Sequence, residues 1–329
     1  MRQPTLAVLV LAACSHHAAT TSPDAAPDSA SDATCGGQDL ALQFHPANFL
    51  VVLDRSCSMK QLLSGTQTTK WTAAVTALHD ALAGYPDALR WGLTMFPDTT
   101  GESCAQDAIP FPLADHNAAA IDTLLQSALA TTDALYPAKG PCVTNIDTGV
   151  EQAATDPSLA MTDRKSYLLL VTDGGQAGCS LGGGAAGAVS AVADLASRGV
   201  TTFVVGFGSS VNATELDNLA AAGGAPQPGA HEYFQADDAT ALDTTIAAIA
   251  SQAVSCAITV DPAPPDGSQL YVWFDHTTSV PRDPSHTSGW DYDPATHAVT
   301  LYGSSCDELK THTVTSVNII FGCPNPPIL

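Results

Sequence analysis

The chain has few basic residues, few aromatic residues and no long uninterrupted apolar run in its interior. Eleven Lys and Arg stand against 33 Asp and Glu in 329 residues, which gives a formal net charge of −22. A nucleic-acid-binding protein needs a basic face to meet phosphates, so the composition argues against that class. No run of about 18 apolar residues occurs beyond the N-terminus, so no internal helix is expected to span a bilayer.

Aromatic residues make up only 6% of the chain, although apolar residues reach 45% and charged residues only 13%. A packed core is therefore expected, built mainly from Ala, Val, Leu and Ile. The sequence also contains no HExxH, no GxxxxGK[ST] and no CxxC pair. Helix-borne zinc proteases, phosphate-binding loops and thioredoxin chemistry are accordingly unsupported. We expect no enzyme activity, and a hydrolase with an unrecognised site stays the least favoured alternative.

The first fourteen residues have the composition of an export signal. One positive charge precedes a short apolar run that is too short to span a membrane. The run ends in Leu11-Ala12-Ala13-Cys14, which resembles a bacterial lipobox. The resemblance implies cleavage before Cys14 and lipidation of its thiol, and Ser15 after it favours the outer membrane. Residues 1–14 are thus predicted to be a lipoprotein signal with the anchor cysteine, and the membrane contact to be the lipid alone.

Residues 15–45 are predicted to be a disordered linker. Positions 15–34 contain no large apolar residue, so this segment cannot bury enough surface to offset its ordering entropy. If Cys14 carries lipid, eight cysteines remain, and an even number in an exported protein favours disulfides. Their connectivity is open.

Residues 46–255 are predicted to form an α/β domain with a doubly wound, mostly parallel sheet. Continuous apolar runs indicate strands buried on both faces, whereas residues 89–96 alternate more and favour an edge position. The predicted strands cover 48–53, 89–96, 167–171 and 202–207. Apolar residues at spacings of three and four predict intervening helices over 70–84, 117–130, 185–198, 213–222 and 239–254.

Residues 256–329 are predicted to form a small antiparallel β module without helices. Short alternating strands are separated by turn sequences such as Pro264-Pro265-Asp266-Gly267. The cysteines at 256, 306 and 323 lie in or beside this module and could cross-link it, since a module of this size has a thin core.

Two of the predicted buried strands end in an aspartate, Asp54 and Asp173. The carboxyl ends of parallel strands lie at one edge of a sheet, where ligands of such folds bind. Asp54 opens the pattern Asp54-Arg55-Ser56-Cys57-Ser58, whose carboxylate and hydroxyls can converge on a cation that prefers oxygen ligands. A third loop brings Thr144 in front of another predicted helix, with Thr148 four residues further on.

These segments resemble the von Willebrand factor type A family. The matching pieces are residues 52–59, Thr144 in its loop, and Val171-Thr172-Asp173-Gly174-Gly175. The resemblance implies a metal-ion-dependent adhesion site in which Ser56, Ser58 and Thr144 ligate a divalent ion, with Asp54 and Asp173 binding directly or through water. Around this sheet edge we expect the disulfides Cys57–Cys179 and Cys104–Cys142.

The expected ion is Mg²⁺, with Ca²⁺ or Mn²⁺ as possible substitutes. An ion held mainly by neutral hydroxyls keeps positive charge and an open position, which a Glu or Asp carboxylate of a partner can fill. The sequence therefore predicts an exported lipoprotein of the bacterial outer membrane or cell surface that binds a protein or surface ligand. The alternative is a structural envelope protein in which the metal only stabilises the fold.

Overall fold

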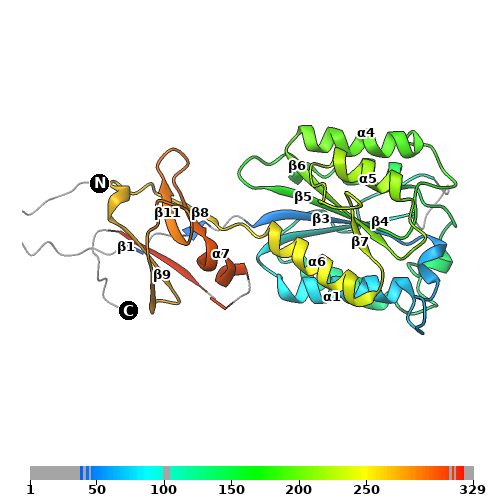
Figure 1. Ribbon diagram of the computed structural model, residues 1–329, viewed down its shortest axis with the longest axis horizontal. Helices are drawn as coiled ribbons and strands as arrows, with labels where there is room; N and C mark the ends of the chain where they lie inside the picture. Colours follow the sequence, from blue (N-terminus) through cyan, green and yellow to red (C-terminus); the bar gives the residue numbers. More distant parts are fainter. Residues whose placement is uncertain are drawn as a thin grey trace, which may run out of the picture. The chain divides into compact units, whose positions relative to one another are not determined.

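The computed structural model describes residues 38–39, 42–43, 46–98, 104–310, 313–314 and 316–321. The predicted signal segment with Cys14, and most of the predicted linker, lie outside these residues. Two folded parts are present: an α/β domain over residues 46–254, and a β module built from chain segments on both sides of it (Figure 1). Within the described residues no helix is long and apolar enough to cross a membrane.

A five-stranded, all-parallel sheet forms the centre of the α/β domain, in the order β4-β3-β5-β6-β7. The strands are β3 (Ala47–Asp54), β4 (Leu89–Phe96), β5 (Ser166–Thr172), β6 (Val200–Phe207) and β7 (Phe234–Ala236). The doubly wound fold is confirmed, and β4 lies at an edge as its alternation predicts. Only β7 lacks a sequence signal, since three residues are too few to show a period.

Helices cover both faces of this sheet (Figure 1). One apolar core lies under α1 (Lys70–Gly84), α2 (Ala118–Ser127) and α6 (Ala239–Ala253). A second core lies under α3 (Ile146–Ala153), α4 (Gly184–Ser197) and α5 (Ala213–Ala222). Short 3₁₀ turns, η1 (Cys57–Lys60), η2 (Pro137–Lys139) and η3 (Pro157–Ala160), connect these elements. The continuous apolar strands are explained by this two-sided cover.

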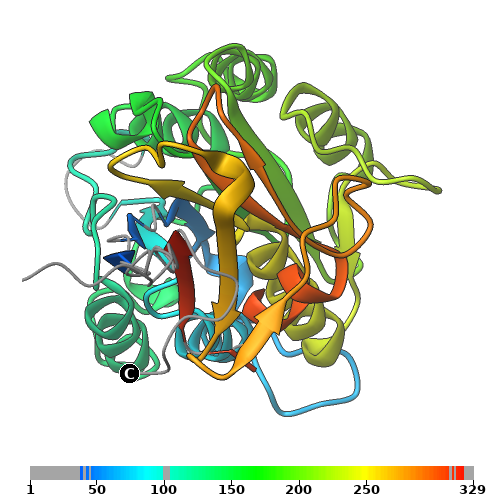
Figure 2. The same cartoon turned by 90° about the vertical axis from the view of Figure 1, so that its left-hand side faces the viewer.

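The β module contains two four-stranded antiparallel sheets, whose gold to red strands can be followed in Figure 2. One has the order β1-β13-β9-β10 and the other β11-β12-β8-β2. Inward side chains such as Val272, Trp290 and Val299 form their shared core. The strands are β1 (Gln38–Asp39), β2 (Leu42–Gln43), β8 (Ala257–Val260), β9 (Leu270–Phe274), β10 (Thr278–Val280), β11 (Gly289–Asp293), β12 (Ala298–Tyr302) and β13 (Val317–Phe321).

Two features of this module differ from the sequence prediction. The predicted linker 15–45 contains β1 and β2, which pair with β13 and β8. Two-residue strands carry no readable alternation, and their pairing partners lie more than 200 residues away. A helix, α7 (Gly303–Lys310), also follows β12 in a region where none was expected. The α/β domain is therefore inserted between β2 and β8 of the module.

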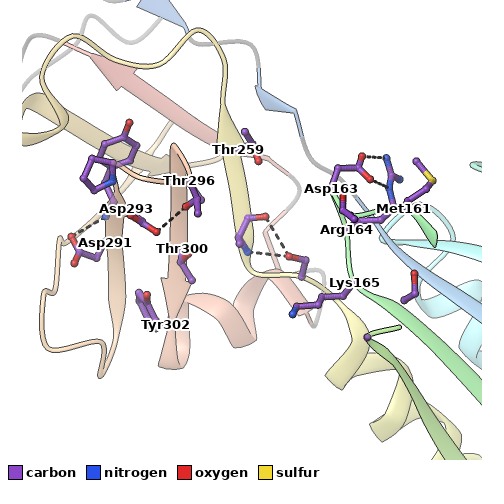
Figure 3. Close-up of a pocket in the computed structure, with 18 of the residues that line it drawn as sticks. Met161, Asp163, Arg164, Lys165, Thr259, Asp291, Asp293, Thr296, Thr300 and Tyr302 are labelled. Atoms are coloured by element: carbon purple, nitrogen blue, oxygen red, sulfur yellow. Dashed lines mark hydrogen bonds and ion pairs between the residues drawn. The ribbon is translucent and has the colours of Figure 1, made fainter. Parts of the chain in front are cut away.

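Local polar contacts close the turn between β11 and β12. The Asp293 carboxylate accepts hydrogen bonds from the Ala295 backbone N–H at 2.8 Å and from the Thr296 hydroxyl at 2.9 Å, the latter drawn in Figure 3. These bonds lower the pKa of Asp293.

The start of β8 is held by the disulfide between Cys256 and Cys306, the latter on α7.

The Cys256–Cys306 disulfide closes a loop across a sequence separation of 50 residues. By the loop-closure entropy of the unfolded chain, a Cys256→Ala, Cys306→Ala variant should lose about 4 kcal/mol of stability in the β module. Urea unfolding followed by the fluorescence of Trp273 and Trp290 measures this loss. Equal unfolding midpoints for the parent and the double variant would contradict it.

Candidate metal centre

The two carboxylates of the predicted site lie at the same edge of the sheet. Strands β3 and β5 are parallel neighbours, with Leu53 beside Val171. Asp54 ends β3 and Asp173 follows β5, so both carboxylates lie at the carboxyl edge. Asp54 is 0% exposed and Asp173 1% exposed. The strand register thus brings together two acidic groups that are 119 positions apart in the sequence.

The loop after β3 turns its two serines toward these carboxylates. The Ser56 backbone N–H donates to Asp54 Oδ1 at 2.7 Å, which shapes the turn. The Ser56 and Ser58 hydroxyl oxygens lie 2.9 Å apart, and Ser58 Oγ donates to Asp173 Oδ1 at 2.7 Å. Four of the five residues predicted as metal-binding therefore form one hydrogen-bonded cluster, in which Asp54 is joined through the Ser56 backbone N–H.

Burial makes the ionised form of Asp54 costly. Loss of solvation and the neighbouring charge of Asp173 raise the pKa of Asp54 to about 6. Hydrogen bonds from the Thr172 hydroxyl, at 2.7 Å from Asp54 Oδ2, and from Ser56 partly offset this rise. The Thr172 contact carries no sequence signal, because Thr172 reads simply as the last residue of a strand.

The fifth predicted residue, Thr144, lies in a loop beside the one that follows Asp173. Thr144 and Ala177 exchange two backbone hydrogen bonds of 2.9 Å each, and Thr144 is 8% exposed. Among the described residues, no hydrogen bond joins the Thr144 hydroxyl to the serines or carboxylates. The Thr148 hydroxyl accepts a bond of 2.7 Å from Asn145 inside α3 and its cap. The Thr144 hydroxyl is thus the less engaged of the two.

Two disulfides fasten these loops, and both predicted pairings are wrong. Cys57 bonds Cys142, with a Cα–Cα distance of 4.9 Å, and Cys104 bonds Cys179, at 5.5 Å. The partners are exchanged because η1 packs against η2, and the chain that leaves η2 reaches Cys142 within a few residues. Cys57 therefore covalently joins the serine loop to the Thr144 loop.

Two charged residues of this region were not predicted from the sequence. Lys70, the first residue of α1, places its ammonium 2.7 Å from Asp173 Oδ2. Asp147 is 0% exposed and accepts bonds from the backbone N–H groups of Gly182 and Gly184 at 3.0 and 2.9 Å. Asp147 thereby caps the start of α4 from α3 and fixes the loop after Asp173. The sequence gives no indication that Lys70 pairs with Asp173, because the two residues are far apart along the chain.

The cluster has the donor set that a small hard cation prefers. An octahedral site with metal–oxygen bonds of about 2.0–2.1 Å has edges of about 2.8–3.0 Å. The Ser56–Ser58 separation of 2.9 Å and the Ser58–Asp173 separation of 2.7 Å are close to such edges. No group of three or more His, Cys, Asp or Glu side chains suited to a metal occurs in the described part of the chain. A metal here would accordingly rely on hydroxyls as well as the two carboxylates.

A GxSxG pattern, the signature of α/β-hydrolase nucleophiles, occurs at residues 178–182. A nucleophile elbow places its serine directly on the turn from strand to helix. Ser180 is instead exposed, eight residues beyond the end of β5, and its neighbour Cys179 is held in a disulfide. The pattern therefore does not have the structural setting of a hydrolase elbow.

The raised pKa of Asp54 predicts a pH dependence of the metal-free protein. Between pH 3.8 and about 6 the folded state holds a proton on Asp54 that the unfolded state has lost. The contribution of Asp54 to stability is therefore complete below pH 3.8 and is lost as the pH rises to about 6, by roughly 3 kcal/mol. Urea unfolding in chelator, compared with Asp54→Asn, isolates this contribution. A stability difference between the two proteins that stays constant from pH 4 to 7 would refute it.

Several solved structures of known proteins are similar to this chain. No curated protein matches the chain. Among solved structures, BatB from Bacteroides thetaiotaomicron is 16% identical, covering 63% of this chain and 98% of its own, with a TM-score of 0.47. A mussel byssus matrix protein with a zinc-occupied adhesion motif is 17% identical (64% and 49%, TM-score 0.46). The pilus adhesin SpaC from Lactobacillus rhamnosus GG is 13% identical (86% and 40%, TM-score 0.47).

This chain spans half or less of the length of the latter two proteins. A sequence model of the von Willebrand factor type A domain matches residues 48–248, which cover the parallel sheet except for the first residue of β3 and include the cluster at its edge. The match extends over more than half of the chain and agrees with the observed strand order. The chain belongs to the von Willebrand factor type A domain family.

Proposed function

We propose that this chain is an exported, non-enzymatic binding protein that holds a divalent ion through Asp54, Ser56, Ser58, Thr144 and Asp173. The observation that supports it is the connected cluster of hydroxyl and carboxylate oxygens at the carboxyl edge of the sheet. Its ligand is a protein or cell-surface molecule that offers a Glu or Asp carboxylate. Mg²⁺ is the proposed ion, with Ca²⁺ and Mn²⁺ as substitutes.

The cluster suits the binding of a ligand carboxylate, because its residues would neutralise only part of the charge of a bound divalent ion. Bound there, a divalent ion would supply a positively charged site for an incoming carboxylate. Ser56, Ser58 and Thr144 offer neutral oxygens, and the Thr172 and Lys70 contacts already engage one oxygen of each aspartate. The similar structures include a pilus adhesin and a byssus matrix protein, which is compatible with this role, but the proposal rests on the cluster.

The proposal places the type A domain on an anchored chain. Residues 1–14 are the lipoprotein signal ending in Cys14, residues 46–255 the type A domain, and residues 256–329 the main part of the β module. The proposed linker begins at residue 15, ahead of β1 (Gln38–Asp39). The lipid on Cys14 is the proposed membrane attachment, on a bacterial outer membrane or cell surface.

Calorimetric titration with Mg²⁺ tests the metal site. The parent protein should bind with measurable heat, and an Asp54→Ala, Ser56→Ala variant should lose it, because two donors of the cluster are gone. Ser64→Ala is the matched control, since Ser64 is an exposed serine a few residues further along the same loop. Equal binding heats for the parent and the paired variant would end the metal claim.

A purely structural metal is the second candidate function. The observation that favours it is the complete burial of Asp54, because an ion that offsets two buried negative charges would stabilise the fold by itself. Cross-linking of intact cells with and without chelator separates the two functions. Partners captured only without chelator support adhesion, whereas an unchanged partner set with a lower melting temperature supports the structural role.

The anchor has an independent test. Cys14→Ser should abolish incorporation of a palmitate analogue into the protein, because serine has no thiol to form the thioether bond with the lipid. Cys35→Ser serves as the control, as it removes another N-terminal cysteine without touching the lipobox. Labelling that persists in Cys14→Ser would refute the lipoprotein assignment.

A further inference from the structure

Lys70 occupies a position where a lysine is unfavourable twice over. It is the first residue of α1, after the N-cap Thr69, so its positive charge lies at the positive end of the helix dipole. Its side chain is also 7% exposed, and a buried ammonium is costly unless it is paired. A specific contact has to compensate for both costs.

That contact is made with the candidate metal centre. Lys70 Nζ lies 2.7 Å from Asp173 Oδ2, and the Asp173 side chain is 0% exposed. Nζ also donates to Ser210 Oγ at 3.0 Å, while Ser210 Oγ donates to the Asp173 backbone carbonyl at 3.3 Å. The other carboxylate oxygen, Oδ1, faces Ser58 at 2.7 Å. The two oxygens of Asp173 are thus divided between an ammonium and the serine cluster.

We propose that Lys70 is a built-in counter-cation that sets the charge of the metal centre. Ionised Asp54 and Asp173 contribute two negative charges, and Lys70 offsets one of them. The centre therefore holds a divalent ion less tightly than its carboxylates alone would allow, and the ion keeps more positive charge for the carboxylate of a ligand. Lys70 is a positioning residue, because it acts through Asp173.

This inference rests on the proposed function, and it also describes the metal-free protein. When no metal ion is bound, Asp173 is still paired with a positive charge, the ammonium of Lys70. Removal of Lys70 should therefore have opposite effects on the two states. The metal-free protein loses the partner of a buried carboxylate and becomes less stable, whereas the metal-bound protein loses a competing positive charge and gains affinity.

The test compares Lys70→Gln with Lys70→Arg, which keeps the charge, and with Lys139→Gln, which removes an exposed lysine from η2. For Lys70→Gln we expect a Kd for Mg²⁺ about tenfold or more below that of the parent, and a melting temperature in chelator several degrees lower. Lys70→Arg and Lys139→Gln should stay near the parent in both measurements. A merely structural lysine would weaken metal binding when replaced, so the direction of the change is decisive.

A second variant guards against failure to fold. Ser210→Ala removes only the exposed hydroxyl that orients Lys70, and its Kd should shift in the same direction by a smaller factor. An unchanged or higher Kd for Mg²⁺ in Lys70→Gln overturns the inference and leaves the proposed function intact. If Lys70→Gln does not fold, the same result in Ser210→Ala overturns it. No Mg²⁺ binding by the parent protein overturns the proposed function, and the counter-cation role toward a metal with it.

Discussion

The central constraint in this protein is the need to balance two buried carboxylates on adjacent parallel strands. Asp54 and Asp173 are almost completely excluded from water, and burial together with the neighbouring Asp173 raises the pKa of Asp54. The surrounding residues meet this cost with the Thr172 hydroxyl, the Ser56 backbone N–H, the Ser58 hydroxyl and the Lys70 ammonium. In the proposed function, a divalent ion bound at the cluster adds further compensation for these charges.

Both connections between the α/β domain and the β module start from the amino edge of the parallel sheet. Strand β3 enters the sheet at its amino edge directly after β2, and α6 returns to the amino edge before β8 begins. Both connections to the β module therefore leave the α/β domain at the edge opposite the candidate metal centre. Two disulfides, from Cys57 to Cys142 and from Cys104 to Cys179, cross-link the loops at the free edge. Loops that carry the candidate site are thus held together by covalent bonds.

The features that the sequence predicted are those with local signals. Continuous apolar runs marked β3, β5 and β6, and helical spacing marked α1 and α5 with the same bounds as in the structure. The serine pattern after β3 identified Ser56 and Ser58, because a pattern of five residues is read from one loop. These features depend only on neighbours along the chain.

The features that the sequence missed depend on contacts between distant segments. Lys70 looked like an ordinary helix residue until the fold placed it beside Asp173, 103 positions away. The pairing of Cys57 with Cys142 follows from the packing of η1 on η2, and β1 and β2 exist only because β13 and β8 offer them partners. Such pairings are set by tertiary packing, so no local sequence pattern predicts them.

Anomalous diffraction of a crystal grown with Mn²⁺ shows most directly whether these side chains hold a metal ion. We expect a single strong anomalous peak at the carboxyl edge of the sheet, within bonding distance of the Ser56 and Ser58 hydroxyls and beside Thr144. A structure in which the serines keep their mutual hydrogen bonds, and in which Mn²⁺ binds elsewhere or not at all, would contradict it.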